Sequence, residues 1–484
     1  MSFLLNLLPP RALFGGIFNL TNSIMGVSLL AMPLCFYQCG LAFGMFLSLL
    51  ATFLSLISCK LMLHSSRVSG SKWGKLAVEV CIIGLLLGSC VAFFAIVADI
   101  LPRFASVWFF PDQSAVALRT PVMSILAVAV VFPLSLMRNV SSLSPLNAIS
   151  LGFYGCFIVA LIYSIASPSE AEQAPEGAPS SELKWFDPSG FLLTLPIFSL
   201  AYTCQFGVFA VYAGLPNPNH KAMNTVINYS IFLASFLYSA VGVFGYIAFS
   251  HVDIDGDLLN NFPDGVVFFD ILKLGFSISI IFSFPITVYP CRAALNTLIF
   301  VPNAPASTTP DVLQSAAAPE PVIPGARFFG LTAGIVFSAL IVALAIPEVA
   351  TILSFTGSTT GTSLAYILPA STFLVLVRAA DVKPRLRRIA ILILVLGVVC
   401  CIGSTALVLY STNPLPVKEV TNSVDIPIEG DTGVKERDVS SSLNRSISSL
   451  SLQSFSRLPS VVSLPISSSA EAGLPPKKSL VNKR

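Results

Sequence analysis

Long apolar runs alternate with short polar connections along most of the chain. Each run holds about 20 residues or more, the length at which a helix crosses roughly 30 Å of hydrocarbon. The pattern therefore predicts an all-α, polytopic membrane protein. About eleven spans can be separated, near positions 13–37, 41–64, 76–101, 121–137, 146–166, 190–212, 223–249, 266–300, 328–346, 352–377 and 389–410.

The same pattern divides the chain into three predicted regions. Residues 1–11 precede the first span and form a short N-terminus, and residues 12–411 form the transmembrane domain. Residues 412–484 are rich in serine, most densely at 440–456, which predicts a disordered tail.

Composition agrees with a membrane protein. Hydrophobic residues make up 55% of the 484 positions and charged residues 11%, against about 25% charged residues in soluble proteins. The high apolar content makes the lipid bilayer the expected surroundings. The net charge of +3 gives no reason to expect a nucleic-acid partner. The 10 cysteines lie in or beside the spans without the spacing of a metal site. Neither a cofactor nor enzymatic catalysis is expected, because no nucleophile–base pair or phosphate loop is found.

Lysine and arginine concentrate in alternate connections. Because cytoplasmic loops carry an excess of these residues, the N-terminus is predicted to be cytoplasmic. Eleven spans then place the tail outside or in a lumen, whereas its serine run is typical of a cytoplasmic phosphorylation segment. The side of the tail stays open, as does the choice between the plasma membrane and an endomembrane such as Golgi or lysosome. The predicted inner basic residues are Arg67, Lys72, Lys75, Arg138, Lys221, Arg292, Arg327, Arg378, Lys383, Arg385, Arg387 and Arg388.

The first span is a poor helix in its middle, where residues 19–33 read N-L-T-N-S-I-M-G-V-S-L-L-A-M-P. Asn22, Ser23, Gly26 and Ser28 stand where a lipid-facing helix would carry leucines, and Pro33 removes a backbone donor. Irregular backbone at membrane depth persists only when it is buried in protein or lines a cavity. Two explanations remain from this stretch alone: a midplane binding site, or close packing of helices through small residues.

The sixth span is interrupted in the same way at residues 201–205, A-Y-T-C-Q. Five spans separate the two breaks, the spacing expected of two inverted repeats of five helices. Corresponding broken spans indicate the binding site of a transporter. Half-helix N-termini there attract a carboxylate, and carbonyls and hydroxyls can coordinate sodium. The second break therefore favours the midplane site.

Several segments resemble a known family: N-S-I-M-G-V-S-L-L-A-M-P (22–33), P-I-F-S-L-A-Y-T-C-Q-F-G-V-F-A-V-Y (196–212) and F-P-I-T-V-Y-P-C-R-A-A-L-N-T-L (284–298). They are similar to the amino acid/auxin permease superfamily, and within it to the sodium-coupled neutral amino acid transporters, solute carrier family 38. The resemblance covers about residues 12–410. It implies a fold like that of the bacterial leucine transporter, with five-plus-five inverted repeats, broken helices 1 and 6, and alternating access.

The resemblance also implies the site residues. Sodium would meet the Asn22 side chain, the carbonyls of Thr21 and Ile24, and the hydroxyls of Ser279 and Ser283, where relatives usually carry threonine. The backbone around Gly26 and Val27 would hold the substrate carboxylate. The full set of expected substrate-binding residues is Ser23, Gly26, Val27, Ser28, Tyr202, Thr203 and Gln205.

The expected function is secondary active transport of small neutral amino acids such as glutamine and alanine, with sodium as the co-transported ion. Serine in place of threonine at the second sodium position leaves proton coupling or uncoupled transport open. An amino acid sensor or signalling protein with little transport is a further alternative. A channel is disfavoured, because two broken helices without a line of charged or filter residues do not form a selectivity filter.

Overall fold

The computed structural model describes residues 11–65, 72–137, 144–166, 183–250, 252–263, 265–300, 323–376 and 384–412. All of these residues belong to one unit of the chain, which extends to Val417. Within this part the regular elements are helices and helical turns. The predicted N-terminus and nearly all of the predicted tail lie outside the described residues, so the predicted boundaries of the three regions stay predictions.

The predicted break in the first span is confirmed. Helix α2 (Phe14–Ile24) ends where Met25 and Gly26 adopt extended backbone, and the Met25 N–H donates to the Thr21 carbonyl at 2.8 Å. The chain resumes as a 3-10 turn, η2 (Val27–Leu29), and continues into α3 (Met32–Cys39), with Pro33 in its first turn. The two halves are bent by 67°.

The predicted break in the sixth span is confirmed as well. A 3-10 turn, η5 (Pro188–Gly190), leads into α10 (Phe191–Ala201), and α11 (Gln205–Ala213) follows after three non-helical residues. The chain therefore has two broken spans at the positions that the sequence indicates. That the two mark inverted repeats of five helices stays a prediction.

The remaining spans are formed by single long helices or by helices joined through π-helical turns. In the described part nine helices are long and apolar enough to cross a membrane, or ten when the bent first span is included. The fifth predicted span is α8, whose residues Gly152–Ala166 form an apolar helix shorter than the others. The helices are α4 (Leu41–Ser65), α5 (Lys72–Trp108), α6 (Ala115–Leu126) with α7 (Phe132–Ser135), α8 (Ser144–Ala166), α12 (His220–Ala248), α13 (Val267–Phe300), α15 (Gly325–Ala345), α16 (Val349–Thr356) with α17 (Leu368–Leu376), and α18 (Pro384–Thr412).

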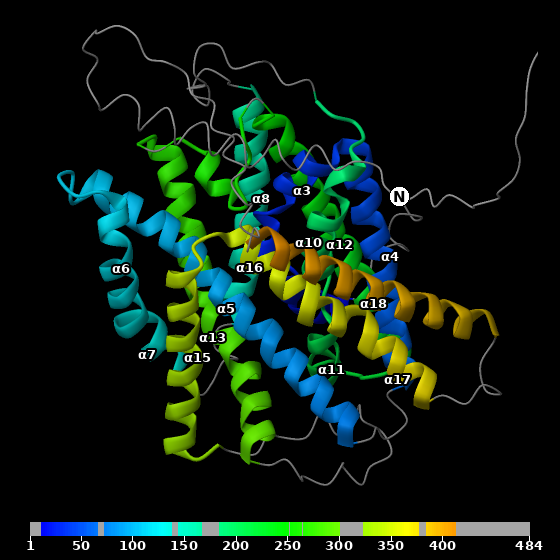
Figure 1. Ribbon diagram of the computed structural model, residues 1–484. Helices are drawn as coiled ribbons and strands as arrows, with labels where there is room; N and C mark the ends of the chain where they lie inside the picture. The colour runs from blue at the N-terminus through cyan, green and yellow to red at the C-terminus, as the bar shows by residue number, and fades with distance from the viewer. Residues whose placement is uncertain are drawn as a thin grey trace, which may run out of the picture. The chain divides into compact units, whose positions relative to one another are not determined.

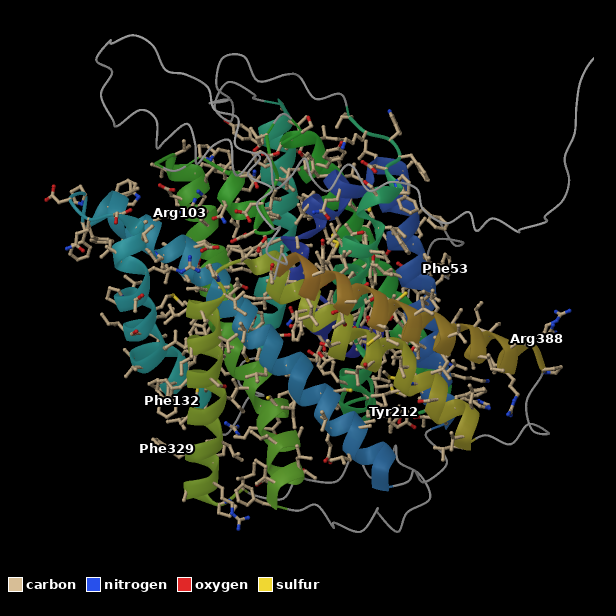
Figure 2. The ribbon with its side chains drawn as sticks, viewed as in Figure 1. Phe53, Arg103, Phe132, Tyr212, Phe329 and Arg388 are labelled. Atoms are coloured by element: carbon tan, nitrogen blue, oxygen red, sulfur yellow. The ribbon has the colours of Figure 1, made fainter. Side chains whose placement is uncertain are left out.

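The outer surface of this helix bundle is apolar. Helices α6 and α7 lie at one edge in Figure 1, and α17 and α18 lie at the opposite edge. Large hydrophobic side chains are exposed on many helices, as Phe53 on α4 shows in Figure 2. An apolar surface of this extent is stable in hydrocarbon and not in water. Further examples are Phe46, Phe232, Phe236, Ile271, Val375 and Leu392.

The tenth span packs closely against the sixth. Two π-helical turns, η7 (Gly357–Gly361) and η8 (Ser363–Ile367), interrupt it between α16 and α17. A methyl group added at Gly357 would lie 2.1 Å from the Pro196 carbonyl oxygen of α10. Glycine at this position therefore permits the backbones of the two spans to approach each other.

Candidate functional site

An internal cavity of about 180 Å³ lies beside the break in the first span. One water requires only roughly 10–15 Å³ by the same measure, so the cavity has room for a small solute. The first, third, fifth, sixth, eighth and tenth spans all contribute to its wall. The lining residues are Asn19, Asn22, Ser23, Ile24, Met25, Gly26, Val27, Ser28, Leu85, Leu86, Ser89, Ala92, Phe93, Tyr154, Leu200, Thr203, Phe206, Phe276, Ser279, Ile280, Ser283, Ile286, Thr287, Pro290 and Leu353.

Most of the sequence-predicted site residues meet at this cavity, although they come from three separate spans. Those in the lining are Asn22, Ser23, Ile24, Gly26, Val27, Ser28, Thr203, Ser279 and Ser283. Thr21, Tyr202 and Gln205 are buried but do not line it.

The cavity wall is mostly apolar, and its polar side chains are uncharged. Among its described lining residues the polar side chains are amides and hydroxyls, and none is Asp, Glu, Lys, Arg or His. Phenylalanines 93, 206 and 276 and several aliphatic side chains supply the rest of the wall. Such a wall can bind a zwitterion through backbone dipoles and hydroxyls, but it offers no counter-charge to an ionised substrate side chain.

Two buried oxygen atoms at the first break have no hydrogen-bond partner among the described residues. They are the Asn22 side-chain carbonyl oxygen, Oδ1, and the Thr21 hydroxyl oxygen, Oγ1. Buried polar atoms are nearly always partnered, so each unpartnered atom needs an explanation. Both are oxygen atoms of the type that coordinates a hard cation or accepts a hydrogen bond from an ammonium group.

Ser279 and Ser283 follow one another by one turn of α13, as their spacing predicts. The Ser283 hydroxyl donates to the Ser279 carbonyl at 2.9 Å, and the Thr287 hydroxyl donates to the Ser283 carbonyl at 3.1 Å. A serine that donates its only hydroxyl proton to the backbone retains acceptor lone pairs on Oγ. Ser283 can therefore still present an oxygen to a ligand in the cavity.

The sequence interpretation missed Tyr238, a fully buried residue of α12. Its hydroxyl lies 2.8 Å from the Ile24 carbonyl, 3.2 Å from the Ala201 carbonyl and 3.1 Å from the Ser28 hydroxyl. A broken helix leaves carbonyls without intrahelical donors. The Tyr238 hydroxyl is a donor to one such carbonyl at each break, Ile24 in the first span and Ala201 in the sixth. An isolated tyrosine in an apolar span carries no periodic signal that would have identified it.

A stripe of small polar residues on α4 supports the sixth-span break from the other side. The Ser48 hydroxyl is hydrogen-bonded to the Tyr202 hydroxyl at 2.8 Å, and the Ser55 hydroxyl donates to the Tyr202 carbonyl at 2.8 Å. Together with Thr52 and Ser58, these residues recur every three or four positions. That spacing is a helical-face signal that the sequence interpretation could have used.

The Gln205 side chain connects the break in the sixth span to the second and tenth spans by hydrogen bonds. Its Oε1 accepts the Cys204 N–H at 2.9 Å, and its Nε2 donates to the Ala365 carbonyl at 3.2 Å and to the Ser58 hydroxyl at 3.3 Å. In this conformation the amide has structural partners on α4 and η8.

The apolar helix bundle and its two broken spans define an integral multi-pass membrane protein, whose uncharged cavity is large enough for a small solute. The chain belongs to the family described as Transmembrane amino acid transporter protein, which matches residues 12–410.

Individual relatives agree with the family assignment. The chain is 33% identical over 370 residues to the "Putative sodium-coupled neutral amino acid transporter 10" of Xenopus laevis, covering 74% of this chain and 34% of that protein. It therefore spans about a third of the length of that relative. "Solute carrier family 38 member 10" of Rattus norvegicus is also 33% identical, over 373 residues, covering 74% of this chain and 32% of that protein. The predicted resemblance to solute carrier family 38 is therefore confirmed. Within that family, the motifs Y-Q-C-G (37–40) and Y-P-C-R (289–292) are similar to the tenth member.

The matches to two more distant proteins cover most of the chain. "Amino acid transporter AVT6E" of Arabidopsis thaliana is 28% identical over 436 residues, covering 82% of this chain and 83% of that protein. A manganese transporter of Eremococcus coleocola matches in structure with a TM-score of 0.47, 10% identity and 92% coverage of each chain. The structural likeness is too distant to support a conclusion.

Proposed function

We propose that this protein is a secondary active transporter of small neutral amino acids such as glutamine and alanine. The observation that supports this most directly is the uncharged cavity at the break of the first span. A zwitterionic substrate carries one positive and one negative charge, and both can be met there by backbone dipoles and hydroxyls. An acidic or basic side chain would be buried in the cavity without a counter-charge, at a large cost in free energy.

The bound substrate would lie against the backbone of Gly26, which is extended, and of Val27, the first residue of η2. Apart from its chain neighbours, no described residue has an atom within 4 Å of a methyl group built at Gly26, so the space beside this residue is open. The helical segment that starts at Val27 directs backbone N–H groups toward its beginning, where a carboxylate is favoured. Ser23 and Ser28 contribute hydroxyls on the same wall, and Thr203 contributes one from the sixth span.

Sodium is the proposed co-transported ion. The unpartnered oxygens of Asn22 and Thr21 provide ligands at the first break, together with the Ile24 carbonyl, which has a second lone pair beside its bond to Tyr238. Ser279 and Ser283 line the same cavity from α13 and provide hydroxyl oxygens. Binding of sodium and substrate would stabilise the closed conformation from which the cavity opens to the cytoplasm.

Uptake into proteoliposomes tests this function. The purified full-length protein is reconstituted, and radiolabelled alanine and glutamine uptake is measured with sodium, with choline in place of sodium, and with an imposed pH gradient. Saturable uptake that requires sodium is expected. Uptake that depends on the pH gradient instead would establish proton coupling, and uptake indifferent to both would establish an uncoupled carrier. Saturable binding without uptake would overturn transport and favour a sensor.

A further inference from the structure

The connection between α12 and α13 is rich in acidic residues, yet it packs deeply against the spans. Leu258 and Leu259, in its short 3-10 turn η6 (Leu258–Asn261), are fully buried. The Leu258 N–H donates to the Leu30 carbonyl at 3.3 Å. Leu30 directly follows η2, so this connection contacts the first span immediately after its break.

Other residues of the same connection contact further spans. A methyl group added at Gly256 would lie 2.7 Å from the Ala350 side chain at the start of α16. The Phe262 ring packs on Phe157 of α8, and the Phe262 carbonyl accepts a hydrogen bond from Lys273 of α13 at 2.8 Å. The segment 252–263, which we call the acidic cap, therefore joins the first, fifth, eighth and tenth spans at one end of the bundle.

Asp257 is the most buried acid of the acidic cap, with no exposed surface. One carboxylate oxygen, Oδ1, accepts the Leu259 N–H at 3.0 Å. The other, Oδ2, has no partner among the described residues. A buried ionised carboxylate with an unpartnered oxygen is costly in free energy, and binding of a proton lowers this cost by removing the charge.

Charged groups on α5, α6, α13 and the acidic cap itself lie around the turn that Asp257 caps. From α13, Asp270 and Lys273 line one small pocket with Leu259 of that turn. Asp99 and Arg103 lie on α5, where Figure 2 labels Arg103, and Asp255 lies in the acidic cap itself. Arg119 of α6 holds Asp99 at 2.9 Å.

Burial raises the pKa of Asp257 to about 8. The neighbouring carboxylates of Asp99 and Asp255 act in the same direction as burial. The Leu259 N–H and Arg103 oppose them and favour the ionised form.

We propose that Asp257 is a proton-binding site whose occupancy controls how firmly the acidic cap packs on the broken first span. In the neutral form the carboxyl group tolerates burial, and the hydrogen bond from Leu258 to Leu30 is maintained. In the ionised form the carboxylate gains hydration when the acidic cap separates from the spans. Because the acidic cap contacts the first span next to its break, the pH on the cap's side of the membrane influences the position of that span beside the cavity.

The direction of this linkage follows from proton binding. When the acidic cap is released, Asp257 has an ordinary pKa near 4, whereas in the packed form its pKa is about 8. The packed form therefore binds the proton more tightly. Packing weakens by up to tenfold per pH unit as the pH rises from about 4 to about 8, and it is constant above that range.

Thermal unfolding of the purified full-length protein between pH 5.5 and 8.0 tests the proposal without requiring transport. The variant Asp257→Asn is neutral at every pH and retains an oxygen that can accept the Leu259 N–H. The melting temperature of the wild type is expected to fall as the pH rises, and this fall is expected to be much smaller in Asp257→Asn. The control Asp112→Asn changes an exposed acid between α5 and α6 and should follow the wild type. Equal pH slopes in the wild type and Asp257→Asn would overturn the proposal.

Hydrogen exchange of the wild-type protein gives a second test that does not depend on the folding of a variant. After correction for the intrinsic effect of pH, protection of the Leu258 amide is expected to decrease about tenfold per pH unit across this range. Protection that does not change with pH would refute the proton site. A consequence for uptake rests on the proposed function, whereas these two measurements remain valid if the protein does not transport.

Discussion

The Tyr238 hydroxyl lies 2.8 Å from the Ile24 carbonyl oxygen and so ties the seventh span to the break in the first. The same hydroxyl lies 3.2 Å from the Ala201 carbonyl, the last residue of α10 before the second break. A hydroxyl has one proton, so it can donate fully to one carbonyl at a time. The carbonyls at the two breaks therefore share one hydrogen-bond donor, the Tyr238 hydroxyl.

Replacing Tyr238 with phenylalanine tests this arrangement. The variant retains the ring, which packs edge-on against Tyr202 with centroids 5.4 Å apart, and removes only the hydroxyl. Because buried carbonyls then lose their donor, stability is expected to fall by about 1 kcal/mol. Amino acid uptake is expected to fall by about tenfold, since the geometry of both breaks is relaxed.

The control for this variant is Tyr410→Phe, which changes an exposed tyrosine of α18. Melting temperature and uptake are measured for both variants. If Tyr238→Phe and Tyr410→Phe behave alike, the hydroxyl of Tyr238 does not support the breaks.

Asn22→Ala is expected to weaken sodium activation of uptake. The substitution removes the unpartnered oxygen Oδ1 without disturbing a hydrogen bond made by that atom. The sodium concentration for half-maximal uptake is therefore expected to rise by about tenfold, a loss of about 1.4 kcal/mol, while the amount of folded protein changes little. The matched control is Asn217→Ala, in the exposed connection after α11. An unchanged sodium dependence in Asn22→Ala would remove Asn22 from the sodium site.

Gly357→Ala is expected to destabilise the packing of the tenth span on the sixth. The added methyl group would lie 2.1 Å from the Pro196 carbonyl, so the backbones must separate, at a cost of about 1–3 kcal/mol. Gly334→Ala on α15 is the control, because no described residue outside the adjoining turns of its own helix comes within 4 Å of the added methyl group. Alanine there should be neutral or slightly stabilising. A melting temperature of Gly357→Ala at or above that of Gly334→Ala would contradict the close packing.

The sequence predicted the spans and both breaks, because apolar length and the loss of helix-forming residues are local signals. Most of the predicted site residues do line the cavity: Asn22 and Gly26 come from a stretch whose composition indicates a broken helix, whereas Ser283 is implied by the family resemblance. It did not reveal that the side chains of Tyr202 and Gln205 have partners on α4, or that Tyr238 joins the two breaks. Those relationships depend on the rotation and approach of helices far apart in the sequence, which periodicity does not specify.

The acidic cap illustrates the same limit. Its aspartates predicted only a polar connection, because acidic residues in a loop are ordinarily solvated. Asp257 caps a turn whose first two residues, Leu258 and Leu259, are fully buried, and it is buried with them. Only the tertiary structure shows that an acid of this loop is buried.

Gly26→Val tests the central claim, that the cavity beside the first break is the amino acid site. Gly26 has φ −142° and ψ −159°, an extended conformation with negative φ, and apart from its chain neighbours no described residue has an atom within 4 Å of a Cβ built there. The valine would occupy space that only the substrate is proposed to fill. We predict an unchanged melting temperature and a loss of saturable alanine and glutamine uptake. Wild-type substrate affinity in a folded Gly26→Val protein would contradict the assignment.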